Sequence, residues 1–318
     1  MVHLPGLGNW PITDGPGGRN AIMEGHGLEK FADARLIATS ANRAWSLLSA
    51  ELRSHPVGEI GAFTPHNAEI TQTISDTGSA YSVRASGGVR QQVVADPGTI
   101  WLCPAGICEE ATRLSAEMPE VLHIYLPPHS FLGPMSERHP NFRAQDLRYE
   151  SGSGHADLLA LTSRIVGELR QETSSGGLRM DILALELIET LAQDHSETAP
   201  SRKPLALAKG ILDRPRLDRV LDYIEANLDS EIGIGELAEV ACFSLFHFVR
   251  AFHLATGRPP HAYLSERRLD RARQLLAYSD STLVDIALTC SFSSQANFTK
   301  AFKRATGMSP GRYRRAAR

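Results

Sequence analysis

Apolar residues recur at helical spacing through the last third of the chain. Phe248, Ala251, Phe252 and Ala255 fall at positions i, i+3, i+4 and i+7, the spacing that buries one side of a helix. Residues 214–318 keep this period almost throughout, and short turn-like segments separate the periodic stretches. The pattern predicts an all-helical C-terminal domain over residues 214–318.

This region also contains an internal repeat. The segment from Phe248 to Pro260 recurs from Phe298 to Pro310, with identical Phe, Ala, Thr, Gly and Pro positions at an offset of 50 residues. The preceding segment, 237–243, recurs as 286–292 at an offset of 49, so one residue is added in the second turn. Each copy predicts a short helix, a tight turn and a longer helix, which is the helix-turn-helix shape.

Residues with capping chemistry stand where these helices should begin and end. Ser244 and either Ser293 or Ser294 can cap the longer helices, and Gly257 and Gly307 can end them. The connecting segment, 259–279, predicts a helix of about 28 Å at 1.5 Å per residue. That length could hold two reading helices about one DNA turn apart, roughly 34 Å.

The faces opposite the apolar stripes carry side chains suited to DNA. Arg, Gln and Asn match the hydrogen-bonding edges of bases, Lys suits phosphate, and free N–H groups at helix starts can hold phosphates. The predicted DNA-binding residues are Ser244, Phe246, His247, Val249 and Arg250 in the first copy, and Ser294, Gln295, Ala296, Asn297, Thr299 and Lys300 in the second.

The N-terminal half has a different pattern, with short runs of apolar and polar residues separated by turn residues. Strands are predicted within 45–52, 68–75, 80–85, 91–95, 99–104 and 120–126, which favours a small β-barrel or sandwich. Two helical stretches follow, and together they predict a helical hairpin over 157–194. The apolar stripe after Met180 suits either packing within the domain or a dimer contact.

The C-terminal sequence from LAEVACFSLFHFVRAF through NFTKAFKRATGMSPGRYRR resembles the AraC/XylS family of transcription regulators. The resemblance implies seven helices with two helix-turn-helix units. It also implies base contacts at the matched positions, which are Phe246, Val249, Arg250, Gln295, Ala296 and Lys300. The turn glycine usual in the family is replaced by Cys242 in the first unit and Ser291 in the second, which would be strained if the backbone there has positive φ.

The N-terminal half resembles, less specifically, the cupin-like effector and dimerisation domains of that family, through the segment DPGTIWLCPAGICEE. We therefore expect an α+β two-domain protein with a cupin-like β-barrel. The predicted divisions are a flexible arm at 1–30, an effector and dimerisation domain at 31–195, a linker at 196–213 and the DNA-binding domain at 214–318. Expected partners are promoter DNA, a small-molecule effector, a second copy of the chain and, for an activator, RNA polymerase.

Charge and composition agree with this division. Residues 214–318 hold 16 Lys and Arg against 11 Asp and Glu, a net charge of +5, whereas residues 1–213 hold 17 against 25, a net charge of −8. No signal peptide and no apolar run long enough to span a membrane are visible, so a cytoplasmic protein is expected. The absence of a His-x-His pair predicts no metal site, and no cofactor is expected.

The isolated histidines (His55, His66, His123, His129) are interpreted as structural. Two rival function classes remain. A DNA-targeted enzyme that takes an alkyl group onto a cysteine would need a reactive thiol, for which Cys103 and Cys108 are the candidates, although burial as small apolar residues is the simpler interpretation. The other rival is a constitutive DNA-binding protein that takes no effector. We expect a regulator without enzymatic activity.

Overall fold

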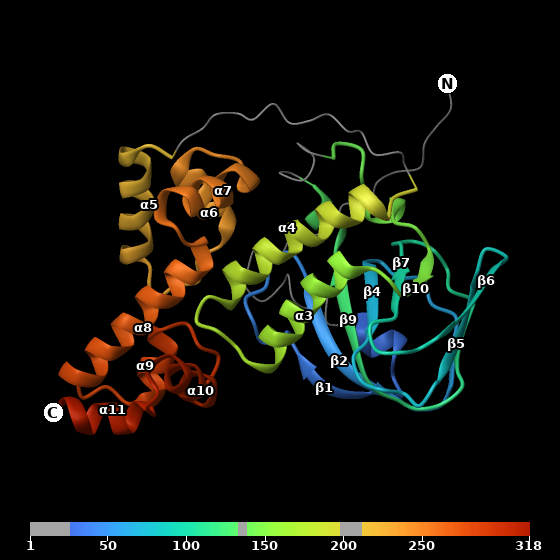
Figure 1. The fold of residues 1–318 in the computed structure, drawn as a ribbon, viewed down its shortest axis with the longest axis horizontal. Helices are drawn as coiled ribbons and strands as arrows, with labels where there is room; N and C mark the ends of the chain where they lie inside the picture. Colours follow the sequence, from blue (N-terminus) through green and yellow to red (C-terminus); the bar gives the residue numbers. More distant parts are fainter. Residues whose placement is uncertain (1–25, 133–138, 198–211) are drawn as a thin grey trace.

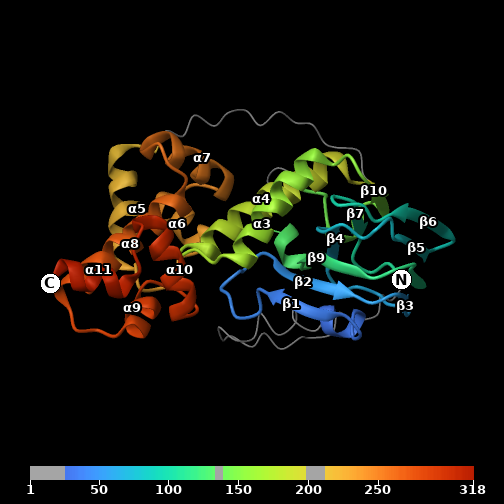
Figure 2. The ribbon, with the colours of Figure 1, turned by 60° about the horizontal axis from the view of Figure 1, so that its bottom comes forward.

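The computed structural model describes residues 26–132, 139–197 and 212–318. A β-rich N-terminal part, two helices lying across it and an all-helical C-terminal part make up these ranges (Figures 1 and 2). The predicted α+β class is confirmed. Most of the predicted arm and of the predicted linker lies outside the described residues.

The N-terminal part consists of two antiparallel sheets. The larger sheet has the order β1(Arg35–Thr39), β2(Ser49–His55), β9(Met118–Leu126), β4(Ala68–Thr73), β7(Ile100–Cys103), β10(Glu150–Gly152). The smaller sheet has the order β3(Gly58–Ile60), β8(Ala111–Leu114), β5(Tyr81–Ser86), β6(Val89–Val94).

Both faces of the larger sheet are buried, but with different chemistry. Leu52 on β2 stands opposite Leu122 on β9, and these apolar side chains belong to the main core together with the helices that cover this face. The alternate residues point to the space between the sheets, where Glu69 and His123 are buried polar groups. Since side chains alternate along a strand, one strand supplies both an apolar outer face and a polar inner one.

The predicted strands lie at or near β2, β4, β5, β6, β7 and β9. The strand predicted at 45–52 begins four residues later, at Ser49. Strands β1, β3, β8 and β10 were not predicted; all have five residues or fewer and little apolar alternation. Short strands are stabilised mainly by pairing with a neighbouring strand. The local sequence pattern does not show which strand that neighbour is.

Two helices, α3(Ala156–Arg170) and α4(Gly176–Asp194), form the predicted hairpin across the larger sheet (Figure 1). The apolar residues of α4 are buried within the chain itself. They join one continuous core with residues of the C-terminal helices, including Val220 and Leu237. The stripe on α4 therefore packs within the chain, the first of its two predicted roles.

The C-terminal part is a set of helices joined by short turns: α5(Arg214–Ala226), α6(Ile234–Ala241), α7(Leu245–Thr256), α8(Pro260–Tyr278), α9(Leu283–Thr289), α10(Gln295–Thr306) and α11(Pro310–Ala317). Ser244 and Ser294 hold the N-cap positions, and Gly257 and Gly307 end their helices in the left-handed conformation. The predicted helix boundaries of both helix-turn-helix units are confirmed.

The turn inside each unit requires an unusual backbone. Cys242 has φ 54° and Ser291 has φ 56°, both in the left-handed region that favours glycine. These are the positions where the family resemblance implied a glycine. Both units thus keep the turn geometry with a residue that is strained in it.

Two details of the prediction are wrong. Ala255 and Ala305 were expected on the buried stripes but are exposed, because each stripe ends one turn earlier, at Phe252 and Phe302. Residues 26–30, expected in a loose arm, are helical, and the Lys30 side chain is almost fully buried between two carboxylates.

Among the described residues no single helix has the length and apolar composition needed to cross a membrane. The bent pair α6 and α7 reaches those limits only when its two helices are taken together.

The strained turn of the second unit gives a stability prediction. Ser291→Gly should raise the free energy of unfolding by about 0.5–1 kcal/mol, because release of left-handed strain exceeds the added backbone entropy of the unfolded chain. Gly307→Ala is the matched control; φ there is 75° with open space around the position, and it should destabilise by about 1–2 kcal/mol. Urea unfolding measures both, and an unchanged or lower stability of Ser291→Gly would contradict the strain argument.

Candidate nucleic-acid interface and N-terminal pocket

The start of α7 carries the predicted residues of the first unit. Arg250 is exposed, whereas Phe246 and Val249 are half-buried and pack against the main core. The Ser244 hydroxyl lies 2.9 Å from Nδ1 of His247, so these two side chains engage one another at the helix start. On this helix Arg250 is the predicted residue most available to a ligand.

The start of α10 carries the second set. Gln295, Ala296 and Lys300 are exposed, and Thr299 is half-buried beside them. The Ser294 hydroxyl accepts a hydrogen bond from the Asn297 N–H at 3.2 Å, so it caps its own helix. Asn297 is half-buried, and its side-chain amide donates to Glu172 at 2.6 Å. The second unit therefore presents an exposed polar face, on which Asn297 is already hydrogen-bonded to Glu172.

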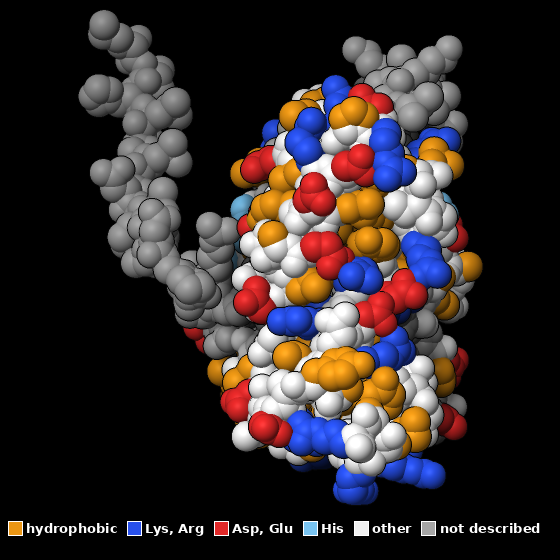
Figure 3. Space-filling view, turned by 90° about the vertical axis from the view of Figure 1, so that its left-hand side faces the viewer, with side chains coloured by type: hydrophobic (Ala, Val, Ile, Leu, Met, Phe, Trp, Pro, Cys, Tyr) orange, Lys and Arg blue, Asp and Glu red, His pale blue; other side chains and the backbone are white. Residues whose placement is uncertain are grey.

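One helix holds the two units together. α8 has 19 residues, about 28 Å at 1.5 Å per residue, and Leu264 and Leu276 anchor it in the cores of the first and the second unit respectively. The face of the C-terminal part that is turned away from the N-terminal part bears acidic and basic side chains side by side (Figure 3). That face is not a continuous basic surface. The net positive charge of residues 214–318 is therefore not concentrated on it.

A second candidate site lies between the two sheets. It is a cavity of about 60 Å³, lined by Lys30, Phe31, His55, Ile60, Glu69, Thr71, Ser82, Arg84, Trp101, Cys103, Glu109, Thr112, Leu114, Met118, Val121 and His123. One side is apolar and the other is charged. A cavity of this size has room for only a few waters or a very small group.

The charged side is a compact network of paired groups. The Lys30 ammonium lies 2.5 Å from Oε2 of Glu69 and 2.5 Å from Oε2 of Glu109. Burial alone lowers the pKa of Lys30, but the two carboxylates outweigh it and raise that pKa above its ordinary value. Lys30 is thus a buried cation that compensates two buried anions.

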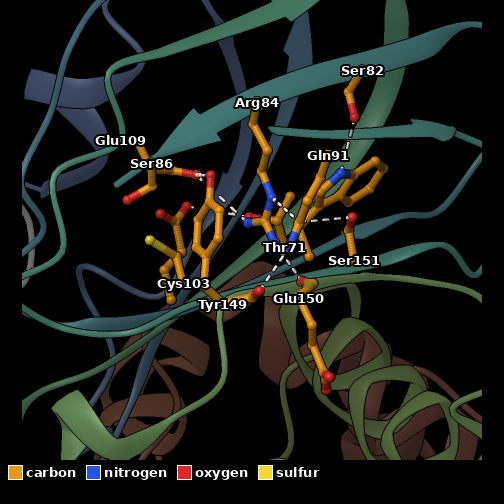
Figure 4. Close-up of polar contacts among 12 residues, drawn as sticks. Thr71, Ser82, Arg84, Ser86, Gln91, Cys103, Glu109, Tyr149, Glu150 and Ser151 are labelled. Carbon is orange, nitrogen blue, oxygen red and sulfur yellow. Dashed lines mark hydrogen bonds and ion pairs between the residues drawn. The ribbon is translucent and has the colours of Figure 1, made fainter. Parts of the chain in front are cut away.

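Arg84 extends this network across the smaller sheet (Figure 4). Its Nε donates to Gln91 at 2.9 Å, its guanidinium stacks 4.0 Å from the Tyr149 ring centroid, and Tyr149 donates to Glu109 at 3.2 Å. Trp101 donates to Ser82 at 2.9 Å on the apolar side. These contacts hold the side chains of Arg84, Trp101 and Glu109 in place at the cavity wall.

The structure brings two of the four singled-out histidines together. The Nε2 atoms of His55 and His123 lie 2.9 Å apart, and Nδ1 of His123 lies 3.1 Å from Glu69. Burial, followed by the nearby His123, lowers the pKa of His55 to about 3, so His55 is neutral. His66 and His129 are exposed. No group of three or more potential ligands is arranged to hold a metal ion within the described ranges.

The two cysteines considered as alkyl acceptors lie in different environments. Cys103 is buried, as predicted, and its pKa is raised by burial and by the charge of Glu109, which disfavours the nucleophilic thiolate. Cys108 is exposed, so the expectation of burial is wrong for this residue, which lies between β7 and β8 outside any strand.

Sequence reasoning named His55, Cys103 and His123 but missed the charged residues that line the pocket beside them. Glu69 and Thr71 on β4 alternate with apolar neighbours, which in a sequence is equally typical of a solvent-exposed sheet face. Nor did it indicate Glu172, which lies in the turn between α3 and α4.

Two helix-turn-helix units in tandem, joined by one anchored helix, define a class of DNA-binding domain. Comparison with known proteins agrees. A family described as "Helix-turn-helix domain" matches residues 237–316. "Probable transcriptional regulator LumQ" of Photobacterium leiognathi is 43% identical over 100 residues, 31% of this chain and 40% of that protein. "Uncharacterized HTH-type transcriptional regulator YbfP" of Bacillus subtilis (strain 168) is 38% identical over 98 residues, 31% of this chain and 33% of that protein.

Two solved structures are similar to about a third of the chain. The DNA-binding domain of AdpA in complex with a target DNA is 32% identical, with 32% of this chain and 91% of that chain covered and a TM-score of 0.31. An AraC-type regulator from Chromobacterium violaceum is 30% identical, with 32% and 92% covered and a TM-score of 0.31. The chain spans less than half the length of the curated relatives LumQ and YbfP.

The C-terminal domain belongs to the AraC-type helix-turn-helix family. Residues 237–316 are therefore a DNA-binding module of the kind found in AraC-type transcriptional regulators.

The buried ion network gives a prediction for the N-terminal part. Lys30→Met should lower the free energy of unfolding by about 3–5 kcal/mol, because it leaves Glu69 and Glu109 buried without their shared cation. Unpaired buried carboxylates have raised pKa values in the folded state, so the loss should shrink as the pH falls from 8 to 5. Adding Glu69→Gln should restore part of the stability. Equal urea unfolding curves for the wild type and Lys30→Met at pH 8 would contradict this account.

Proposed function

We propose that this protein is a sequence-specific transcription regulator that places α7 and α10 in successive major grooves on one face of promoter DNA. The observation that carries the proposal is the pairing of two matched helix-turn-helix units on α8. The helix is about 28 Å long, which suits two reading helices roughly 34 Å apart. Arg250 and Lys300 occupy corresponding exposed positions on the two reading helices.

The base-reading roles follow from side-chain chemistry. Arg250 and Gln295 can each make paired hydrogen bonds to a base edge, while Lys300 can contact guanine or phosphate. Ala296 and Val249 can only meet a thymine methyl group. The remaining predicted contacts are Ser244, Phe246, His247, Ser294, Asn297 and Thr299, and among them the serines stand at helix starts where phosphates bind.

The cavity between the sheets is the proposed effector site. It combines an apolar side, which includes Trp101 and Met118, with the charged side around Lys30, so it suits a small amphipathic molecule. Because the cavity measures only about 60 Å³, entry of an effector requires the side chains around Lys30 to move. Such a movement would couple effector binding to DNA binding, with coupling energies of about 1–3 kcal/mol typical of allosteric proteins.

The further partners are also part of the proposal. A cytoplasmic homodimer would place two copies of the tandem unit on one promoter, and RNA polymerase would be the partner of an activator. Since α4 is buried within the chain, a dimer contact needs another surface. The edge strand β1 offers exposed Leu36 and Ile37, and its outer edge pairs with no strand among the described residues.

The test is DNA affinity after selection of a preferred site from a random-sequence duplex library. Arg250→Ala should weaken binding by about 1–3 kcal/mol and relax sequence preference at one position. Lys300→Ala, if it removes a phosphate contact, should weaken binding on all sequences and lower the slope of log affinity against log salt by about 1.

Arg219→Ala is the matched control, because Arg219 is exposed on α5 outside both helix-turn-helix units. Its affinity should stay within about twofold of the wild type, since a single charge far from the DNA is largely screened. Equal losses in all three variants would point to non-specific attraction, and selection of no preferred sequence would refute sequence-specific binding.

A further inference from the structure

The turn between α3 and α4 contacts the second helix-turn-helix unit at the start of its reading helix (Figure 2). Glu172 in this turn lies against the N-terminal end of α10. Its carboxylate accepts hydrogen bonds from the backbone N–H of Ser293 at 2.9 Å and from the Asn297 side chain at 2.6 Å. The Ser293 hydroxyl donates to Oε2, the carboxylate oxygen that also accepts from Asn297, whereas the Ser293 N–H donates to Oε1.

The contact has the chemistry of anion binding. The N-terminus of a helix carries partial positive charge and free N–H groups, and the favoured ligand there is a phosphate or a carboxylate. Glu172 supplies such a carboxylate from the acidic N-terminal part of the chain. A DNA phosphate approaching the same donors would meet a negative charge already in place.

A second contact lies further along α10. The Arg304 guanidinium donates to the side-chain oxygen of Gln171 at 2.6 Å. Gln171 and Glu172 are adjacent in the turn, whereas Asn297 and Arg304 are two helical turns apart on α10. The turn therefore lies along one side of the reading helix and contacts it at two points.

The turn is held in this position by the connecting helix α8 as well. Ser175 donates to the carbonyl of His261 at 2.7 Å, and the hydroxyls of Ser174 and Ser265 lie 3.0 Å apart. The buried guanidinium of Arg268 also donates to the carbonyl of Ser174. Because these contacts anchor the turn on α8, Glu172 is presented to α10 on a rigid support.

We propose that Glu172 is an internal competitor for a DNA phosphate, so that the docked hairpin turn blocks the second reading helix and must be released before α10 binds DNA. This inference rests on the proposed function and describes how the DNA-binding surface of α10 is regulated. Docking and DNA binding at α10 exclude each other, and so any change in the N-terminal part that loosens the turn favours DNA binding. By reciprocity, DNA binding must loosen the turn.

The test compares the full-length wild type with Glu172→Gln and with Glu110→Gln on the selected duplex. Glu172→Gln removes the competing charge but keeps the size and shape of the side chain. Glu110→Gln removes the same charge from an exposed site just before β8 in the β-rich part, far from α10 in the chain. Glu172→Gln should bind DNA at least fivefold more tightly, whereas Glu110→Gln should stay within twofold of the wild type.

A second readout uses the wild-type protein alone. Amide hydrogen exchange across residues 171–175 should speed up when the duplex is added, because release of the turn exposes its backbone. Unchanged protection of the turn in the DNA complex would overturn the inference, as would equal affinities of Glu172→Gln and Glu110→Gln. In both cases the wild type still binds the duplex, and the proposed function stands. If no variant binds any duplex, the proposed function fails and the competition fails with it.

Discussion

A guanidinium in the middle of α8 is buried and directs its hydrogen bonds to main-chain carbonyls from separate segments. Arg268 donates to Leu228 at 2.9 Å and to Ser230, both in the loop between α5 and α6, and to Ser174 in the hairpin turn. The carbonyl of Arg268 lies 3.4 Å from the Cys290 thiol at the end of α9. Burial lowers the pKa of Arg268 to about 10, so the group remains charged near neutral pH.

The placement of both reading helices depends on this group. A buried charge is tolerated only if its hydrogen bonds are satisfied, and here the satisfying carbonyls come from the first unit and the N-terminal part, while α9 of the second unit packs alongside. If the turn separates from α8, the hydrogen bond from Arg268 to the Ser174 carbonyl is lost, and this donor must bond to water or to another group. The docked arrangement is thus stabilised by Arg268 but is opposed by a DNA phosphate that competes with Glu172 for the donors at the start of α10, as expected for an equilibrium between two states.

The C-terminal helices could be predicted from the sequence because their determinants are local. Phe248 and Phe298 repeat the same stripe, Gly257 and Gly307 end the same helix, and Thr282 caps α9 through its bond with Asp285. Even the strained turn positions, Cys242 and Ser291, were marked by the family pattern. Each of these signals lies within a few residues of the feature that it specifies.

The pocket and the docking contact could not be predicted, because their determinants are not local. Glu69, Thr71 and His123 alternate with apolar neighbours along their strands like residues on a solvent-exposed face, and only the second sheet turns that face into an interior. Glu172 meets Asn297 across 125 residues of sequence, between two parts of opposite net charge. A single sequence contains no periodicity that links two such positions.

The account depends most directly on two reading helices binding one face of a duplex. Hydroxyl-radical footprinting of the full-length protein on its selected site measures this arrangement. The account predicts two protected segments centred about 10–10.5 base pairs apart on the same face of the duplex, with the weaker one, at α10, strengthened in Glu172→Gln. A single protected segment that stays single in Glu172→Gln, or no protection at low salt, would contradict it.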